Sequence, residues 1–207
     1  MPTRIFLLRH AETSQPHIFH GAESDIGLSD RGVRQAAAVA SLLAAERPRA
    51  VVSSAMRRAV DTALPIARAC GVAHHLEPDL HERRVGALTG MPFRDNEVWP
   101  DTVARWSRGE TGYAPPGAES FDDIRNRVLP VWQRLAETFA GQTLVIVAHG
   151  IVCKVLLLSI VPNHSVNDWQ RLGPIHNVGV SELVRDNQWS LVRFNQLPEV
   201  RGIQEEW

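Results

Sequence analysis

The most constraining feature of this sequence is the apolar segment 143–147, Thr-Leu-Val-Ile-Val, which is followed by Ala148, His149 and Gly150. A short continuous run of aliphatic residues predicts a strand that is buried on both faces, as in a parallel sheet. Residues 151–161 are also apolar and are long enough for a helix. A buried strand that leads directly into a helix is the unit from which α/β folds are built.

Strand and helix signals alternate along the rest of the chain. Further strands are predicted at residues 4–8, 50–53 and 72–76, and further helices at 32–46, 56–69 and 121–139. Ser29 or Asp30 is expected to cap the first of these helices, Gly71 to end the second, and Pro130 to kink or split the third. This alternation predicts a three-layer α/β/α sandwich with a mostly parallel central sheet.

Two segments of the chain do not follow this alternation of strands and helices. Residues 178–185 and 188–194 are expected to pair as a hairpin that turns at 186–187. Residues 84–118 are rich in glycine and proline and contain two tryptophans and a tyrosine, which predicts a loop-and-helix insertion with a short helix near 93–108. We expect residues 1–207 to form a single domain with this small insertion over the site.

Composition excludes several classes of protein. Hydrophobic residues make up 44% and charged residues 22% of 207 residues, which is typical of a globular domain. The formal net charge of -1 indicates neither nucleic acid nor a membrane as a partner. Cys70 and Cys153 are expected to be buried thiols, and the apolar run 5–8 is too short for a signal peptide. These features predict a cytoplasmic protein. Lys154 is its only lysine.

Reactive polar residues follow the predicted strands. Arg9 and His10 end the first strand, Arg58 comes shortly after the second, Glu82 follows the third, and His149 ends the strand at 143–147. In open α/β sheets, ligands bind outside the carboxyl ends of the strands. One crevice is therefore expected to hold two histidines, two arginines and a carboxylate.

This set of side chains suits phosphoryl transfer. Arginine binds phosphate oxygens in a bidentate manner, and the amides after His149 would open a helix whose N-terminus favours anions. A neutral imidazole can attack phosphorus, while a carboxyl group donates a proton to the departing oxygen. Each residue alone has a simpler reading, because Glu82 can be a solvated loop acid and His149 a hydrogen-bonded core histidine.

The motifs together resemble a known family. They occupy residues 8–13, 28–36, 53–63, 80–86, 116–120 and 147–150. The chain resembles, over about residues 3–195, the histidine phosphatase superfamily, also called the phosphoglycerate-mutase-like family. The resemblance implies the fold of that family, no metal or other cofactor, a small phosphorylated metabolite as substrate and inorganic phosphate as product.

The resemblance also implies roles for individual residues. His10 would be the phosphorylated histidine, Arg9, Arg58 and His149 would complete the phosphate pocket, and Glu82 would be the proton donor. The expected substrate-binding residues are Arg9, Thr13, Gly21, Arg58, Arg83, His149 and Gly150. No metal site is expected at His74, His75 and His81, because strand alternation would separate their side chains.

Departures from the mutase pattern favour hydrolysis. The glycine after the catalytic histidine is Ala11, and residues typical of mutases are replaced at Pro16, Val85, Phe93, Ser107 and Ile151. In mutases these positions hold the carboxylate and second phosphate of phosphoglycerate. Their loss predicts a phosphomonoesterase in which water reaches the phosphohistidine on His10. The alternatives are a cofactor-dependent phosphoglycerate mutase and a non-catalytic phosphate-binding or regulatory member.

The leaving group is expected between residues 14–26 and the insertion. The residues expected to contact it are His17, Phe19, His20, Arg83, Arg84, Trp99, Trp106 and Tyr113. The alternative for the tryptophans is that they pack the insertion against the core. A phosphosugar, a nucleotide, phosphoserine and ribazole phosphate all stay open as substrates, and so does a homodimeric state.

Overall fold

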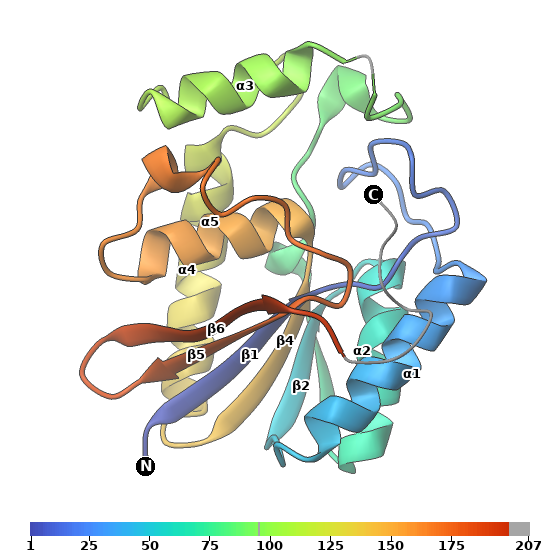
Figure 1. The fold of residues 1–207 in the computed structure, drawn as a ribbon, viewed down its shortest axis with the longest axis vertical. Coiled ribbons are helices and arrows are strands. Elements are labelled where there is room, and N and C mark those ends of the chain that lie inside the picture. Colours follow the sequence, from blue (N-terminus) through green and yellow to red (C-terminus); the bar gives the residue numbers. More distant parts are fainter. Residues whose placement is uncertain (95, 199–207) are drawn as a thin grey trace.

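A six-stranded sheet forms the centre of the molecule (Figure 1). In the computed structural model, which describes residues 1–94 and 96–198, the strand order is β3-β2-β4-β1-β5-β6. The strands are β1 (Thr3–Arg9), β2 (Ala50–Ser54), β3 (His74–Glu77), β4 (Thr143–Ala148), β5 (Val180–Arg185) and β6 (Trp189–Gln196). The first four are parallel, β5 is antiparallel to β1, and β6 pairs with β5 as the predicted hairpin.

Helices cover both faces of the sheet, which confirms the three-layer sandwich (Figure 1). Helices α1 (Asp30–Ala44) and α2 (Arg57–Cys70) cover one face, and α4 (Phe121–Thr138) and α5 (Gly150–Ile160) cover the other. Strand β1 serves both layers, because Ile5 and Leu7 join one apolar cluster while Phe6 and Leu8 join the second. Alternate side chains of a strand point to opposite faces, so the part of a strand that is enclosed by two helical layers, here residues 5–8, is apolar at successive positions.

Local signals placed most element ends correctly. Ser29 caps α1 by accepting the Gly32 amide, and Gly71 ends α2 in the left-handed conformation at φ 66°. The predicted start of the third strand at residue 72 was wrong by two residues, since β3 begins at His74. Helix α4 continues through Pro130 without a break, because Pro130 lies on the exposed side, where the carbonyl that loses its partner can be hydrated.

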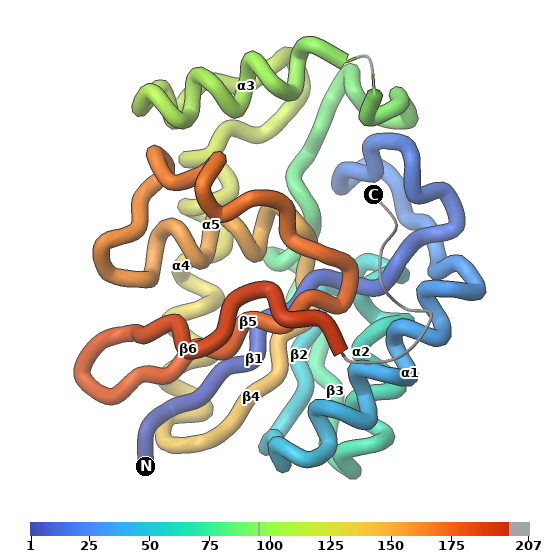
Figure 2. The backbone as a smooth tube through the Cα atoms, viewed as in Figure 1, coloured from blue at the N-terminus to red at the C-terminus, as the bar shows by residue number. Residues whose placement is uncertain are grey.

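The insertion lies above the carboxyl ends of the strands (Figures 1 and 2). It contains the short turn η2 (Gly86–Leu88) and helix α3 (Val98–Ser107), which is shorter than the predicted 93–108. Ile18 and Pro92 form an antiparallel bridge that ties the segment after β1 to the insertion. Two further short turns are η1 (Pro78–Leu80) and η3 (Val166–Asp168).

The two thiols differ from one another. Cys153 is buried, as predicted, whereas Cys70 is only half-buried, and both are free. Among the helices of the described residues, none combines the length and apolar character needed to cross a bilayer.

Candidate active site

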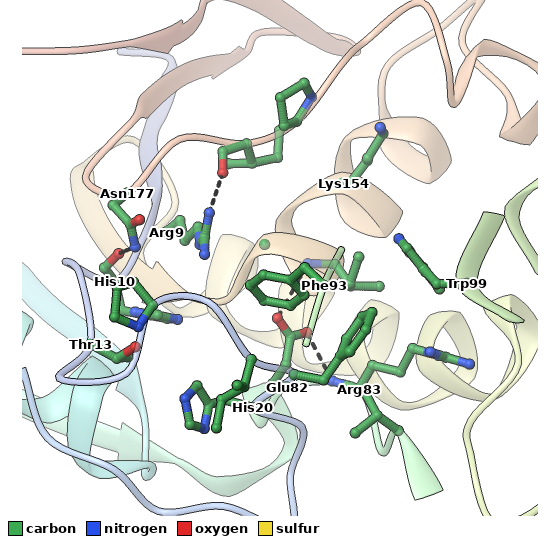
Figure 3. A pocket seen from close by; sticks show the side chains of 18 of the residues that line it. Arg9, His10, Thr13, His20, Glu82, Arg83, Phe93, Trp99, Lys154 and Asn177 are labelled. Carbon is green, nitrogen blue, oxygen red and sulfur yellow. Dashed lines mark hydrogen bonds between the residues drawn. The ribbon is translucent and has the colours of Figure 1, made fainter. Parts of the chain in front are cut away.

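A cavity of about 420 Å³ opens at the carboxyl ends of the parallel strands, beneath the insertion (Figure 3). Six of the expected catalytic and substrate-binding residues line this cavity: Arg9, His10, Thr13, Glu82, Arg83 and Gly150. They come from the end of β1, the segment after β3 and the start of α5. The topology thus gathers residues that are more than a hundred positions apart in the chain.

His10 is held in one tautomer. Its Nδ1 lies 2.7 Å from the Ala11 carbonyl oxygen, and a carbonyl only accepts, so Nδ1 carries the proton. In the neutral ring, Nε2 then has the free lone pair. The His10 backbone is fixed as well, because its amide donates to the Ala148 carbonyl at 2.9 Å and its carbonyl accepts from Asn177 Nδ2 at 2.9 Å.

The surroundings keep His10 uncharged. Burial lowers its pKa well below the ordinary value of 6.5, and the positive charges of Arg58 and Arg9 lower it further. His10 is 5% exposed and therefore borders the cavity while most of the ring is enclosed. A neutral imidazole with a free Nε2 is suited to nucleophilic attack.

Arg58 and His149 lie behind His10, and neither is on the cavity wall. Both side chains are fully buried, and the His149 ring packs edge-on against the His10 ring at 5.2 Å between centroids. Burial and then Arg58 lower the pKa of His149 well below 6.5. Arg58 Nη1 donates to the Ser24 carbonyl at 2.7 Å, and its Nη2 to the His20 and Gly21 carbonyls at 3.2 Å. Gly21 thus orients Arg58 and does not line the cavity.

Several buried polar atoms around His10 have no hydrogen-bond partner within the described part of the protein. They are Arg9 Nε, Arg58 Nε and both ring nitrogens of His149. Buried polar groups are nearly always satisfied, so a cluster of unsatisfied ones indicates a place where a ligand binds. Because two of these side chains are guanidinium groups, the ligand that fits is an anion.

Glu82 stands at the N-terminus of α5. Its Oε1 accepts the Arg83 amide at 2.8 Å, and its Oε2 receives the Ile151 amide at 3.4 Å (Figure 3). The carboxyl group is half-buried and lines the cavity. A carboxyl group at this place can exchange a proton with a ligand oxygen.

The expected leaving-group residues divide into two sets. Phe19, His20, Arg83 and Trp99 line the cavity, whereas His17, Arg84, Trp106 and Tyr113 do not. Trp106 is fully buried and donates its Nε1 hydrogen to the Tyr113 carbonyl at 2.8 Å. Trp106 therefore packs the insertion against the core, whereas Trp99 both lines the cavity and packs edge-on against Trp106 and Trp169.

Several residues of the site could not be predicted from the sequence. Asn177, Lys154 and Trp169 line the cavity, and Thr62 accepts the Ala11 amide at 2.9 Å. Only Lys154 had a signal in the sequence, because it follows Gly150 by four residues in the predicted helix and so lies on the same helix face. Nothing in the local pattern distinguished Asn177, Trp169 or Thr62 from ordinary polar and core residues.

The alanine after His10 has a physical explanation. Ala11 is fully buried and belongs to the apolar cluster beneath α1 and α2. It is not among the described residues with positive φ, so its backbone does not require glycine. A methyl group at this position adds packing without strain.

The histidines near β3 have separate roles. His74 Nε2 lies 2.8 Å from Ser53 Oγ, and His81 Nδ1 lies 2.7 Å from the Glu82 carbonyl. Within residues 1–94 and 96–198, no three His, Cys, Asp or Glu side chains cluster closely enough to hold a metal ion.

Residues 5–197 match the histidine phosphatase superfamily (branch 1), so the chain belongs to that family. A metal-independent phosphoserine phosphatase from Arabidopsis thaliana is 32% identical over 209 residues, covering 97% of this chain and 84% of that protein. A glucosyl-3-phosphoglycerate phosphatase from Mycolicibacterium vanbaalenii is 31% identical over 189 residues, with coverages of 87% and 83%. The solved structure of a mycobacterial glucosyl-3-phosphoglycerate phosphatase is 26% identical with a TM-score of 0.81, covering 94% of this chain and 99% of that one. These relatives support phosphatase activity.

Proposed function

We propose that this chain is a metal-independent phosphomonoesterase that hydrolyses a small phosphorylated metabolite through a phosphohistidine on His10. The observation that carries the proposal is the hydrogen bond between His10 Nδ1 and the Ala11 carbonyl, which leaves Nε2 as the nucleophile. The cavity of about 420 Å³ suits a small molecule. The relatives named as phosphatases are consistent with this reaction.

In the first step, His10 Nε2 attacks phosphorus in line with the ester oxygen. The N–P bond forms as the P–O bond breaks, and the leaving oxygen takes a proton from the Glu82 carboxyl group. Arg9 lines the cavity and can bind a phosphoryl oxygen, while the unpartnered nitrogens of Arg58 and His149 lie behind His10. Their fixed positions stabilise charge in the transition state without reorganisation.

In the second step, water attacks the phosphohistidine. The Glu82 carboxylate takes a proton from this water, the N–P bond breaks, and inorganic phosphate leaves with His10 again neutral. The pKa of His10, lowered by burial and the two arginines, favours the neutral ring at the end of each cycle.

The mutase alternative is disfavoured by the residues on the cavity wall. Four of the five positions at which mutase residues are replaced line the cavity, namely Pro16, Val85, Phe93 and Ile151, whereas Ser107 does not. The side chains of these four residues offer no hydrogen-bond donor to hold a bisphosphate intermediate while it reorients. We therefore expect water as the acceptor.

The proposal is tested by trapping the intermediate with radiolabelled p-nitrophenyl phosphate. The label is expected on His10, labile to acid and stable to alkali, and His10→Ala is expected to lose both label and turnover. His164→Gln, a change in a half-buried histidine outside the cavity, serves as the control. Wild-type hydrolysis by His10→Ala would refute the mechanism, and isomerisation of phosphoglycerate with bisphosphoglycerate would favour the mutase.

A further inference from the structure

Lys154, the only lysine of the chain, lies on the cavity wall at a distance from the phosphoryl site. In Figure 3 it is on the side of the pocket opposite His10 and Thr13, together with Trp99. The side chain is buried, with 6% exposure, although lysine is among the residues least often found inside proteins. Its position requires an explanation that the reaction at His10 does not give.

Helix α5 connects Lys154 with the part of the cavity wall where Glu82 lies. Lys154 follows Gly150 by four residues on α5, so both are on the same helix face and both line the cavity. Glu82 Oε2 receives the Ile151 amide at the start of this helix. One helical turn, about 5–6 Å of helix axis, therefore separates the backbone at Gly150, next to the Ile151 amide that Glu82 binds, from the backbone at Lys154.

The charge of Lys154 has no carboxylate partner among the described residues. Its Nζ donates one hydrogen bond, to the Gly173 carbonyl at 2.6 Å, and it lies 4.5 Å from the centroid of the Trp169 ring. An ammonium group has three hydrogens, so donors are left for a ligand. A buried cation without a counter-ion gains much by binding an anion.

The walls around Lys154 are aromatic. Trp169 packs edge-on against Trp99 at 6.1 Å and against Trp106 at 5.3 Å between centroids. Arg83 lies against the other side of this cluster, 4.9 Å from the Trp99 ring, and its Nη2 is buried without a partner. The rings exclude water and stabilise both cations, which strengthens their attraction for an anionic group.

We propose that Lys154 determines specificity by binding a carboxylate on the leaving group, so that the substrates are phosphomonoesters of small hydroxy acids or hydroxy amino acids. This inference rests on the proposed phosphatase function and concerns the far end of the same cavity. Such a leaving group carries its carboxylate a few bonds from the ester oxygen, a reach of the same order as the helical turn between the Glu82 end of α5 and Lys154. A second phosphate group in place of the carboxylate would present three charged oxygens, whereas Nζ has only two hydrogens left after its bond to Gly173.

Two pairs of substrates isolate the carboxylate. 3-Phosphoglycerate and glycerol 3-phosphate differ only by a carboxylate in place of a hydroxymethyl group, and phosphoserine and phosphoethanolamine differ only by the carboxylate. In at least one pair, the wild-type kcat/KM is expected to favour the carboxylate by more than about tenfold, the effect of one charge-assisted hydrogen bond. Lys154→Met is expected to lower this ratio about 10- to 100-fold, whereas Lys154→Arg, which keeps the charge, retains a preference.

A control and a pH profile separate this role from a structural one. Arg171→Gln removes an exposed positive charge close to Gly173 and should leave the ratio unchanged. Burial lowers the pKa of Lys154 to about 8, so the wild-type ratio should fall as the pH rises through that value. Four other titratable groups on the cavity wall act on both members of a pair and cancel in the ratio; they are Arg9, His10, His20 and Glu82. Arg83 also lines the cavity, but burial lowers its pKa only to about 10, so it stays charged as Lys154 titrates.

Two results would overturn the inference. The first is a wild-type ratio near one in both pairs. The second is an unchanged ratio in Lys154→Met; if both members of a pair lose activity equally, Lys154 only holds Gly173. If the wild-type protein hydrolyses neither these esters nor p-nitrophenyl phosphate, the proposed function fails and the inference falls with it.

Discussion

Thr62 connects the core of α2 to the loop that carries His10. Its hydroxyl accepts the Ala11 amide at 2.9 Å and donates to the Arg58 carbonyl at 2.8 Å. Both Thr62 and Ala11 are fully buried, so water cannot replace the hydroxyl. Thr62→Val exchanges this hydroxyl for a methyl group of similar size and leaves the Ala11 amide without a partner.

The expected cost follows from that single amide. An unsatisfied buried donor costs about 1–3 kcal/mol, because its desolvation is no longer compensated. For a chain of this length, the loss corresponds to a fall of about 2–12 °C in Tm. The amide adjoins the nucleophile, so relaxation of the loop should displace His10 and lower kcat about 10- to 100-fold.

Urea unfolding and kcat on p-nitrophenyl phosphate measure the two effects. Thr138→Val is the matched control, because Thr138 makes the same bond to the carbonyl four residues earlier, at 2.8 Å, on an exposed helix surface. It should change the free energy of unfolding by less than about 0.5 kcal/mol. If Thr62→Val were as stable and active as Thr138→Val, the role assigned to this hydroxyl would be wrong.

Glu82→Gln removes the proposed proton donor, so kcat for glycerol 3-phosphate is expected to fall at least about 100-fold, and kcat for p-nitrophenyl phosphate far less. Equal losses on both substrates would count against Glu82 as the acid. Stability should decrease as the pH falls from 7 to 5, because burial lowers the pKa of His10 and His149 below 6.5 and the unfolded chain takes up protons that the native state does not. The slope is at most about 1.4 kcal/mol per pH unit for each histidine. Urea titrations at three pH values measure it, and a His149→Asn variant as pH-sensitive as the wild type would contradict this account.

Sequence alone determined the order of the elements and the residues at the ends of the strands. Segments 5–8 and 144–147 are apolar at every position, and burial on both faces of a sheet accounts for such runs, as the two clusters around β1 confirm. His10 and His149 follow these two strands directly. Because parallel neighbours end at the same edge of a sheet, their proximity was predictable once the strands were paired.

Only the tertiary structure decided which residues surround the carboxyl ends of the strands. The sequence does not show that Asn177 holds the His10 carbonyl, that Thr62 holds the next amide, or that Lys154 reaches Gly173 and Trp169. Each of these contacts joins residues from different elements through side chains whose local patterns are ordinary. Periodicity and capping act over a few residues of one element, whereas the position of a loop over a sheet depends on packing across the whole core.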